Sequence, residues 1–263
     1  MNYFLKVIAF LMVLSSSVMA QTEDFTEFSA DRPGVATPPD VLSSGKFQLE
    51  NGIQYSNFLT EDIRNENYLF SSLLVRYGLM KGVELHLETN YAYNIEKDSS
   101  GTSVDAGLTP LIIGTKIKII GQHKVIPNLS FVFNLTLPIS GNREFTPKNP
   151  APSFYLLMSN NLSEKLNLCY NYGIAWDGNS SIPVHFYAVC LGIRLNNKWN
   201  VFVEGYGYSA VDIFSLFYMD TGLAYMINDH LQADVSLTGS LSTPCDFFMA
   251  GMGIAWKIPK KKR

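Results

Sequence analysis

The sequence has few charged residues and, beyond residue 20, no long apolar run. Charged residues make up 16% of the chain, against roughly 25% in soluble proteins. The most apolar stretches, residues 108–120 and 213–227, are interrupted by Lys116, Lys118 and Asp220, and neither reaches the roughly 18 residues of a spanning helix. These absences exclude a helical membrane protein. A net charge of -3 provides no attraction for nucleic acid.

Histidine and cysteine are also scarce, with four and three residues, and none recur at the spacing of a metal site. His86 is the one candidate for chemistry, because it alternates with Glu84 and Glu88. It could act as a general base or a weak metal ligand, but a hydrogen bond inside a barrel is the simpler role. His185 could face outward, yet no matching Ser or Asn stands out as its partner in the site of a lipase. The sequence therefore predicts no catalytic residue, no cofactor and no bound metal.

Residues 1–20 have the pattern of a secretory signal peptide. Lys6 precedes an apolar core at residues 7–14, and small residues stand at Val18 and Ala20, where a signal peptidase reads the chain. We expect the mature chain to begin near Gln21, outside the cytoplasm. Residues 21–45 contain three prolines and no periodicity, which predicts an extended periplasmic segment that hangs free or folds into a barrel mouth.

The clearest pattern lies at residues 83–95, where apolar and polar side chains alternate. Period two sends alternate side chains to opposite faces of a strand. This stretch has 13 residues, whereas a strand in a soluble protein usually has five or six and a tilted membrane strand needs about 9–11. One long strand with an apolar face and a polar face is therefore predicted.

The same alternation continues through residues 46–258. We count about 12 strands, joined alternately by short turns and by longer loops rich in Gly, Ser, Asn and charge. Strand ends carry many Tyr, Phe and Trp residues, which favour the headgroup level. A soluble sandwich is the alternative, but its repeat would be nearer 8–12 residues than the roughly 18 counted here. We predict an all-β, antiparallel, up-and-down transmembrane barrel in the bacterial outer membrane, followed by a basic periplasmic tail at residues 259–263.

Polar positions predicted to face the lumen carry charges of both signs. They are the candidate solute contacts: Glu50, Arg76, Glu84, His86, Glu88, Lys116, Lys118, Arg194, Asp220 and Asp234. These charges could line a path for a solute, or they could form a salt-bridged plug that only holds the barrel closed. We expect Arg76, Lys116 or Lys118 to lie beside Glu84, His86 and Glu88.

Two cysteines are predicted to meet. With a turn near residues 179–180, Cys169 and Cys190 fall opposite each other on adjacent strands and both face inward. They could form a disulfide in an oxidising compartment or remain two small thiols. Cys245 is expected in an outer loop.

Short motifs resemble one known family. The chain carries Asp31-Arg32-Pro33, then Gly45-Lys46-Phe47-Gln48-Leu49-Glu50-Asn51-Gly52, and later Val104-Asp105-Ala106-Gly107-Leu108 and Gly114-Thr115-Lys116. These stretches resemble a transporter family named for the meta-pathway of phenol degradation. The resemblance implies an outer-membrane barrel that passes small, often aromatic or hydrophobic, molecules.

The expected partners follow from that resemblance and from the last strand. They are outer-membrane lipids, a small-molecule solute and the barrel assembly machinery. The last is expected because the spacing from Gly251 to Trp256 resembles the final-strand signal that this machinery recognises. The alternatives are a non-conducting structural or adhesion-type barrel and a lipid-acting barrel enzyme.

Overall fold

The computed structural model describes residues 28–59, 63–211, 213–241 and 246–259 of the chain. They form thirteen strands and one 3-10 helix, η1. The elements are β1 Phe47–Leu59, β2 Arg64–Met80, β3 Val83–Asp98, β4 Gly101–Leu108, β5 Ile112–Ile120, β6 Asn128–Thr136, η1 Arg143–Phe145, β7 Ala151–Asn161, β8 Leu166–Ala175, β9 Val184–Arg194, β10 Trp199–Ala210, β11 Ile213–Asn228, β12 Leu231–Ser240 and β13 Asp246–Lys257. In these ranges no helix is long and apolar enough to cross a membrane. The predicted signal peptide and the basic residues 260–263 lie outside them.

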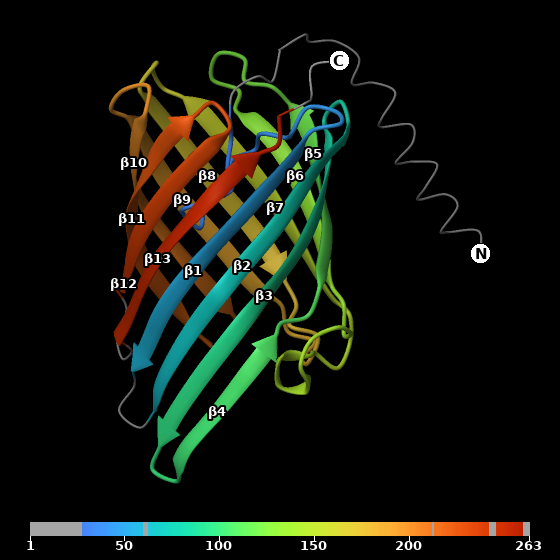
Figure 1. Cartoon of the computed structure of the whole chain (residues 1–263), viewed down its shortest axis with the longest axis vertical. Coiled ribbons are helices and arrows are strands. Elements are labelled where there is room, and N and C mark those ends of the chain that lie inside the picture. The colour runs from blue at the N-terminus through green and yellow to red at the C-terminus, as the bar shows by residue number, and fades with distance from the viewer. Residues whose placement is uncertain (1–27, 60–62, 212, 242–245, 260–263) are drawn as a thin grey trace, which may run out of the picture.

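The sheet closes on itself. Strand β1 pairs with β2 on one side and with β13 on the other, from Gln48 opposite Lys257 to Leu59 opposite Asp246. The remaining strands pair antiparallel with their neighbours in chain order around the circle, except that β4 and β5 both pair with β3 (Figure 1). Closure leaves no free edge between the first and last strands, and it satisfies the backbone polar groups within the sheet. The predicted all-β barrel is confirmed.

One predicted strand is divided in two. The sequence predicts a single strand at residues 104–119, but β4 and β5 share this place along β3. The first half of β3 pairs with β5 and the second half with β4. Pro110 lies in the interruption and has no N–H to donate to a ladder. The barrel wall thus has twelve strand positions, one of which is divided between β4 and β5. The β3–β4 hairpin extends past one rim (Figure 1).

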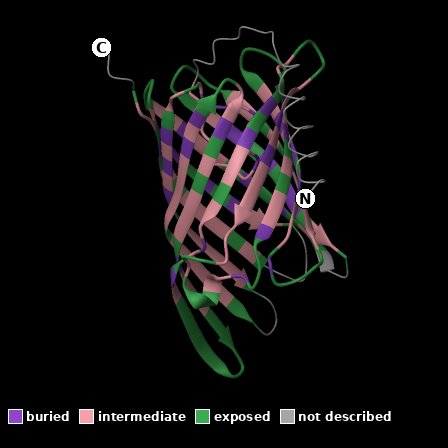
Figure 2. Cartoon of the chain, turned by 90° about the vertical axis from the view of Figure 1, so that its right-hand side faces the viewer, coloured by how far each residue is buried: buried purple, intermediate pink, exposed green. Residues whose placement is uncertain are grey.

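Alternation sorts the side chains as the sequence predicts. Apolar side chains on the outer face are exposed, as Ile53, Val235 and Leu237 show, while Gln48, Glu50 and Ser236 face inward and are buried. Figure 2 shows the alternation along each strand and the exposed surface of the projecting hairpin. An apolar outer face around a polar interior is the pattern of a barrel whose solvent is lipid.

The two rims differ. At the rim where β1 begins and β13 ends, most connections are short, such as β2–β3 and β11–β12 (Figure 1). The opposite rim has the longest ones, β6–β7 and β8–β9, together with the short β10–β11 connection. The β2–β3 connection turns at Gly82, whose φ of 77° favours glycine. Outer-membrane barrels have short turns on the periplasmic side. On this rule we propose that the rim at the start of β1 faces the periplasm.

Residues 28–45 lie inside the barrel, visible in Figure 1 as the blue segment that enters the lumen. They form hydrogen bonds with inward-facing residues of eight strands that surround them: Glu50 and Gln48 of β1, Arg76 of β2, Glu84 of β3, Lys116 of β5, Ser130 of β6, Asn171 of β8, Glu204 of β10 and Asp234 of β12. Of the two placements that the sequence left open for this segment, the described part has the one in the barrel mouth.

Candidate functional site

Three wall carboxylates hold the backbone of the inserted segment, residues 28–45. Glu50 accepts the N–H groups of Asp31 and Arg32 at 3.0 and 3.2 Å. Glu84 accepts the N–H of Leu42 at 2.6 Å. An extended segment buried in a lumen has no ladder of its own, so its N–H groups need such acceptors. The wall therefore supplies the hydrogen bonds that the proline-rich sequence of the segment cannot make internally.

Glu204 on β10 is the third carboxylate. Its two oxygens accept the N–H of Val35 at 2.9 Å and the N–H of Ala36 at 2.7 Å. Beside it, the Asn171 side chain accepts the N–H of Thr37 at 2.7 Å and donates to the Thr37 carbonyl at 3.0 Å. Charged acceptors form the stronger hydrogen bonds, so Glu204 is a principal anchor of the segment.

Basic side chains bind the same segment through its carbonyls and through Asp31. The fully buried Arg76 lies between Asp31, Glu50 and Glu84 at 3.0, 2.9 and 2.7 Å. Lys116 Nζ contacts Asp31 at 2.8 Å and the Pro38 carbonyl at 3.3 Å. Breaking a buried ion pair leaves an uncompensated charge, which costs several kcal/mol. This network therefore locks the segment to β1, β2, β3 and β5.

A gap in the wall accommodates Arg32. Gly52 and Gly253 are register partners on β1 and β13, and a Cβ at either position would overlap the Arg32 guanidinium. From this groove Arg32 reaches Asp234 of β12 at 3.2 Å. Two facing glycines thus form the recess in which a side chain of the inserted segment rests.

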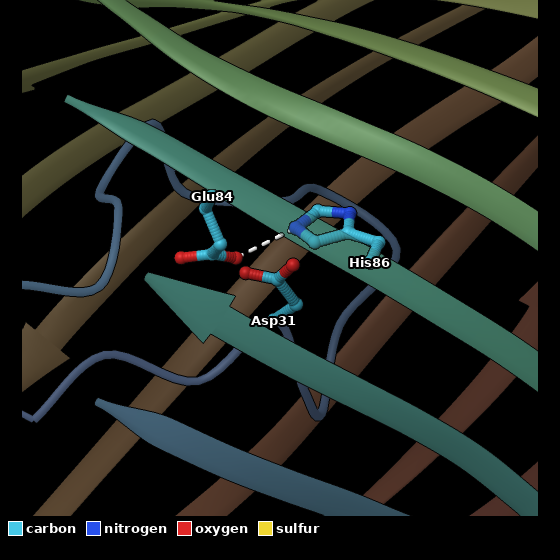
Figure 3. Close-up of side chains that lie close together, drawn as sticks. All are labelled: Asp31, Glu84 and His86. Atoms are coloured by element: carbon cyan, nitrogen blue, oxygen red, sulfur yellow. Dashed lines mark hydrogen bonds and ion pairs between the residues drawn. The ribbon is translucent and has the colours of Figure 1, made fainter. Parts of the chain in front are cut away.

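Figure 3 shows the contact of Asp31, Glu84 and His86. Their ligand atoms lie within 4.8 Å of one another, which is close enough to hold a metal ion. Both carboxylates, however, already bind cationic side chains: Asp31 binds Arg76 and Lys116, and Glu84 binds Arg76. His86 Nε2 lies 2.6 Å from Glu84 Oε1, the hydrogen bond that the sequence favours. The three residues therefore fit a charge network better than a metal site.

A cavity of about 260 Å³ lies against the inserted segment, on the side toward the rim where β6 ends and β9 begins. Asp31, Val35 and Thr37 of the segment contribute to its lining, and residues of β2 to β10 complete it. One part of the wall is polar: His86, Glu88, Lys116, Asn134 and Asn171. The rest is apolar or aromatic: Leu74, Ile112, Val132, Tyr155, Leu157, Phe186 and Tyr208. Such mixed lining is typical of a binding site for a small molecule.

Most predicted lumen charges lie inside the barrel. Glu50, Arg76, Glu84, Lys116, Lys118, Asp220 and Asp234 are buried there, and His86 and Glu88 line the cavity. Arg194 differs, because it is exposed at the periplasmic end of β9 and lies apart from the network around the segment. Their contact with a solute stays a prediction.

Sequence reasoning missed Glu204, Asp31 and Arg32 as site residues. On β10 the charged Glu204 shares a face with Phe202 and Tyr206, so the alternation does not tell inside from outside there. All three are buried or half-buried, and the aromatic face of β10 faces the lumen. The signal for Asp31 and Arg32 is their place in the quoted motif, which gives no position in space.

The predicted cysteine pairing is correct in register. Cys169 and Cys190 face each other on β8 and β9, and both are free thiols rather than a disulfide. The Cys169 Sγ donates to the Thr37 carbonyl at 3.4 Å, so this thiol also contacts the inserted segment. Cys245 lies outside the described residues.

A closed barrel with an apolar exterior, a polar lumen and short periplasmic turns defines an outer-membrane β-barrel protein. The chain belongs to the family described as Putative MetA-pathway of phenol degradation, whose profile matches residues 30–258. The match includes most of the inserted segment, so the segment falls within the family's pattern. No curated protein matches the chain.

Solved structures show the same architecture. The COG4313 outer membrane channel of Pseudomonas putida F1 is similar with a TM-score of 0.65 and 13% identity, over 86% of this chain and 99% of that one. The translocator domain of the autotransporter NalP of Neisseria meningitidis has a TM-score of 0.58 and 10% identity, over 82% and 90%. At these identities the likeness concerns the fold alone.

Proposed function

We propose that the chain is a passive channel for small molecules in the outer membrane, and that residues 28–45 close its lumen. The observation that carries this proposal is the cavity, whose floor is formed by the inserted segment while its wall is formed by the barrel. A molecule that enters from the outer rim reaches this cavity and meets the segment as the last barrier before the periplasm.

The bonds that hold the segment suit a removable barrier. They are hydrogen bonds and ion pairs from wall side chains to its backbone and to Asp31, with no covalent link. Water can replace the hydrogen bonds to the backbone when the lumen hydrates, whereas the buried ion pairs of Asp31 with Arg76 and Lys116 keep the closed state favoured. A cavity of about 260 Å³ lies near the lower end of ligand-pocket sizes, so it accommodates one small solute.

A specific observation favours a competitor. The buried network of Arg76, Lys116, Glu50, Glu84 and Asp31 is also what a permanently closed, structural barrel would contain. A lipid-acting enzyme has less support, since His185 hydrogen-bonds Tyr172 at 2.8 Å rather than a serine. Transport therefore has to be measured.

The test is a reversible lock on the segment. Ala36 packs in one cluster with Cys169, so Ala36→Cys places a third thiol beside the native pair. In planar bilayers and liposome swelling we expect the wild type to pass small solutes, the oxidised variant to pass none, and dithiothreitol to restore passage. If solutes still pass through a fully oxidised variant, residues 28–45 do not close the lumen. A folded wild type that never conducts and never causes swelling would establish the structural barrel instead.

A further inference from the structure

One carboxylate of the cavity, Glu88, has no lysine or arginine partner among the residues that the structure describes. Lys116, the cationic residue of its lining, is bound to Asp31 at 2.8 Å, and nearby Arg76 is bound to Asp31, Glu50 and Glu84. Glu88 takes part in no salt bridge among the described residues, and its hydrogen-bonding neighbour is the neutral Asn90. Its charged or titratable neighbours are Asp31, a second carboxylate, and His86, whose Nε2 is already hydrogen-bonded to Glu84 at 2.6 Å. A half-buried carboxylate without a cation is costly unless something else supplies charge or a proton.

Opposite Glu88, the cavity has an aromatic wall. Tyr155 and Phe186 both pair with Gly173, and Phe186 pairs with Tyr208, so one row crosses β7 to β10. The ring centroids are 6.1 Å apart for Tyr155 and Phe186 and 5.4 Å apart for Phe186 and Tyr208. Gly173 leaves room for the Tyr155 ring, which a Cβ there would overlap. The row offers ring faces to an apolar or cationic guest.

Glu88 belongs to the same space as that row. Both line the cavity, and Glu88 is close enough to interact electrostatically with Tyr155. The arrangement pairs a negative end with an apolar, π-rich end across a volume of about 260 Å³. An anionic guest would meet Glu88 without compensation, whereas an ammonium would replace the missing cation.

We propose that the cavity binds small aromatic molecules that carry an ammonium group, with the ring on Tyr155, Phe186 and Tyr208 and the ammonium on Glu88. The proposal rests on the proposed function only for the assumption that a solute occupies this cavity. It adds a charge preference: the cavity should bind an aromatic cation most tightly, its neutral analogue less tightly and an aromatic carboxylate most weakly.

Binding of three probes with related skeletons tests it: 2-phenylethylammonium, 2-phenylethanol and phenylacetate. Calorimetric titration of the full chain in detergent, against protein-free micelles, is expected to give the ammonium at least about tenfold tighter binding than the alcohol, as expected for a charge-assisted hydrogen bond. Phenylacetate is expected to bind more weakly than the alcohol. Equal affinity for the ammonium and the alcohol would overturn the proposal without any variant.

Variants of Glu88 test whether this residue causes the preference for the ammonium probe. Glu88→Gln is expected to lower the affinity for the ammonium about tenfold and to leave the alcohol unchanged, while Glu88→Asp retains the preference. A Glu88→Gln chain that still prefers the ammonium overturns the assignment. Binding is measured independently of transport. If the ammonium is not preferred, the proposed binding site is wrong but the proposed channel is unaffected. If the chain binds the ammonium selectively but causes no liposome swelling, the proposed channel is wrong and the binding site remains.

Discussion

The Oε2 atom of Glu204 accepts a hydrogen bond of 2.7 Å from the backbone N–H of Ala36. A residue near the middle of β10 thereby holds a segment that precedes β1 in the chain. Its other oxygen accepts the N–H of Val35, so the carboxylate spans two successive peptide groups. This contact provides a direct way to loosen the inserted segment without altering the barrel wall.

Replacing Glu204 with Gln is expected to raise the open fraction of the channel. An amide has only one acceptor oxygen, so its NH2 group would face the N–H of Val35 or Ala36 and leave that donor unpaired, at a cost of about 1–3 kcal/mol. Single-channel recording in planar bilayers measures the change. Glu96→Gln, at an exposed position on β3, is the matched control. Identical open fractions for Glu204→Gln and wild type would show that this contact does not hold the gate.

Replacing Arg76 with Met is expected to reduce the free energy of unfolding by about 3–5 kcal/mol, because three carboxylates lose a buried cation. Adding Glu84→Gln should recover part of the loss, since one uncompensated charge is removed. Urea titration in lipid vesicles, followed by tryptophan fluorescence, measures both variants. Simple additivity of the two single losses would contradict the coupling.

Gly253→Ala is expected to displace Arg32 and break its 3.2 Å contact with Asp234. Loss of this anchor should lower the melting temperature and raise basal conductance. Gly239→Ala is the control, because a Cβ at this β12 position meets nothing within 4 Å. If both variants behave alike in thermal melts and in bilayers, the glycine pair does not serve as a recess for Arg32.

Cys169 and Cys190 are expected to remain unreactive toward a maleimide in the native chain, since Cys169 is buried and contacts Thr37. In a Cys245→Ser background, Glu204→Gln should speed the labelling of Cys169 by about tenfold if it shifts the segment's equilibrium by about 1.4 kcal/mol. Mass spectrometry of labelled, unreduced protein measures the rate. A native mass that shows a Cys169–Cys190 disulfide would contradict the free thiols.

The cost of placing a lysine on the outer face should show which outer positions contact lipid and which contact water. Val235→Lys on β12 is expected to cost about 2–4 kcal/mol if the position lies near the bilayer midplane. Val104→Lys on β4 should cost far less, because β4 belongs to the hairpin that projects past the rim (Figure 1). Both valines are about equally exposed, at 46% and 50%, so exposure alone predicts equal costs. Unfolding titrations in vesicles separate the two expectations.

The sequence by itself determined most of the strands, their faces and the barrel, because period-two alternation is a local property that each strand carries independently. The face of β10 is the exception, since Glu204 lies on the same face as Phe202 and Tyr206. It also determined the register of Cys169 with Cys190, since a turn centred near residues 179–180 sets that pairing. The division of residues 104–119 into β4 and β5 was not predicted, although Pro110 marks the place.

Only the tertiary structure decided what fills the lumen. Residues 28–45 have no periodicity, and their position depends on acceptors at Glu50, Glu84 and Glu204, which come from β1, β3 and β10 and meet only when the barrel closes. The partner of Glu84 was one of three named candidates, and the structure selects Arg76. The position of Glu88 has the same origin. Among the described residues it has no lysine or arginine partner, and that depends on every charge that the closed barrel brings around it.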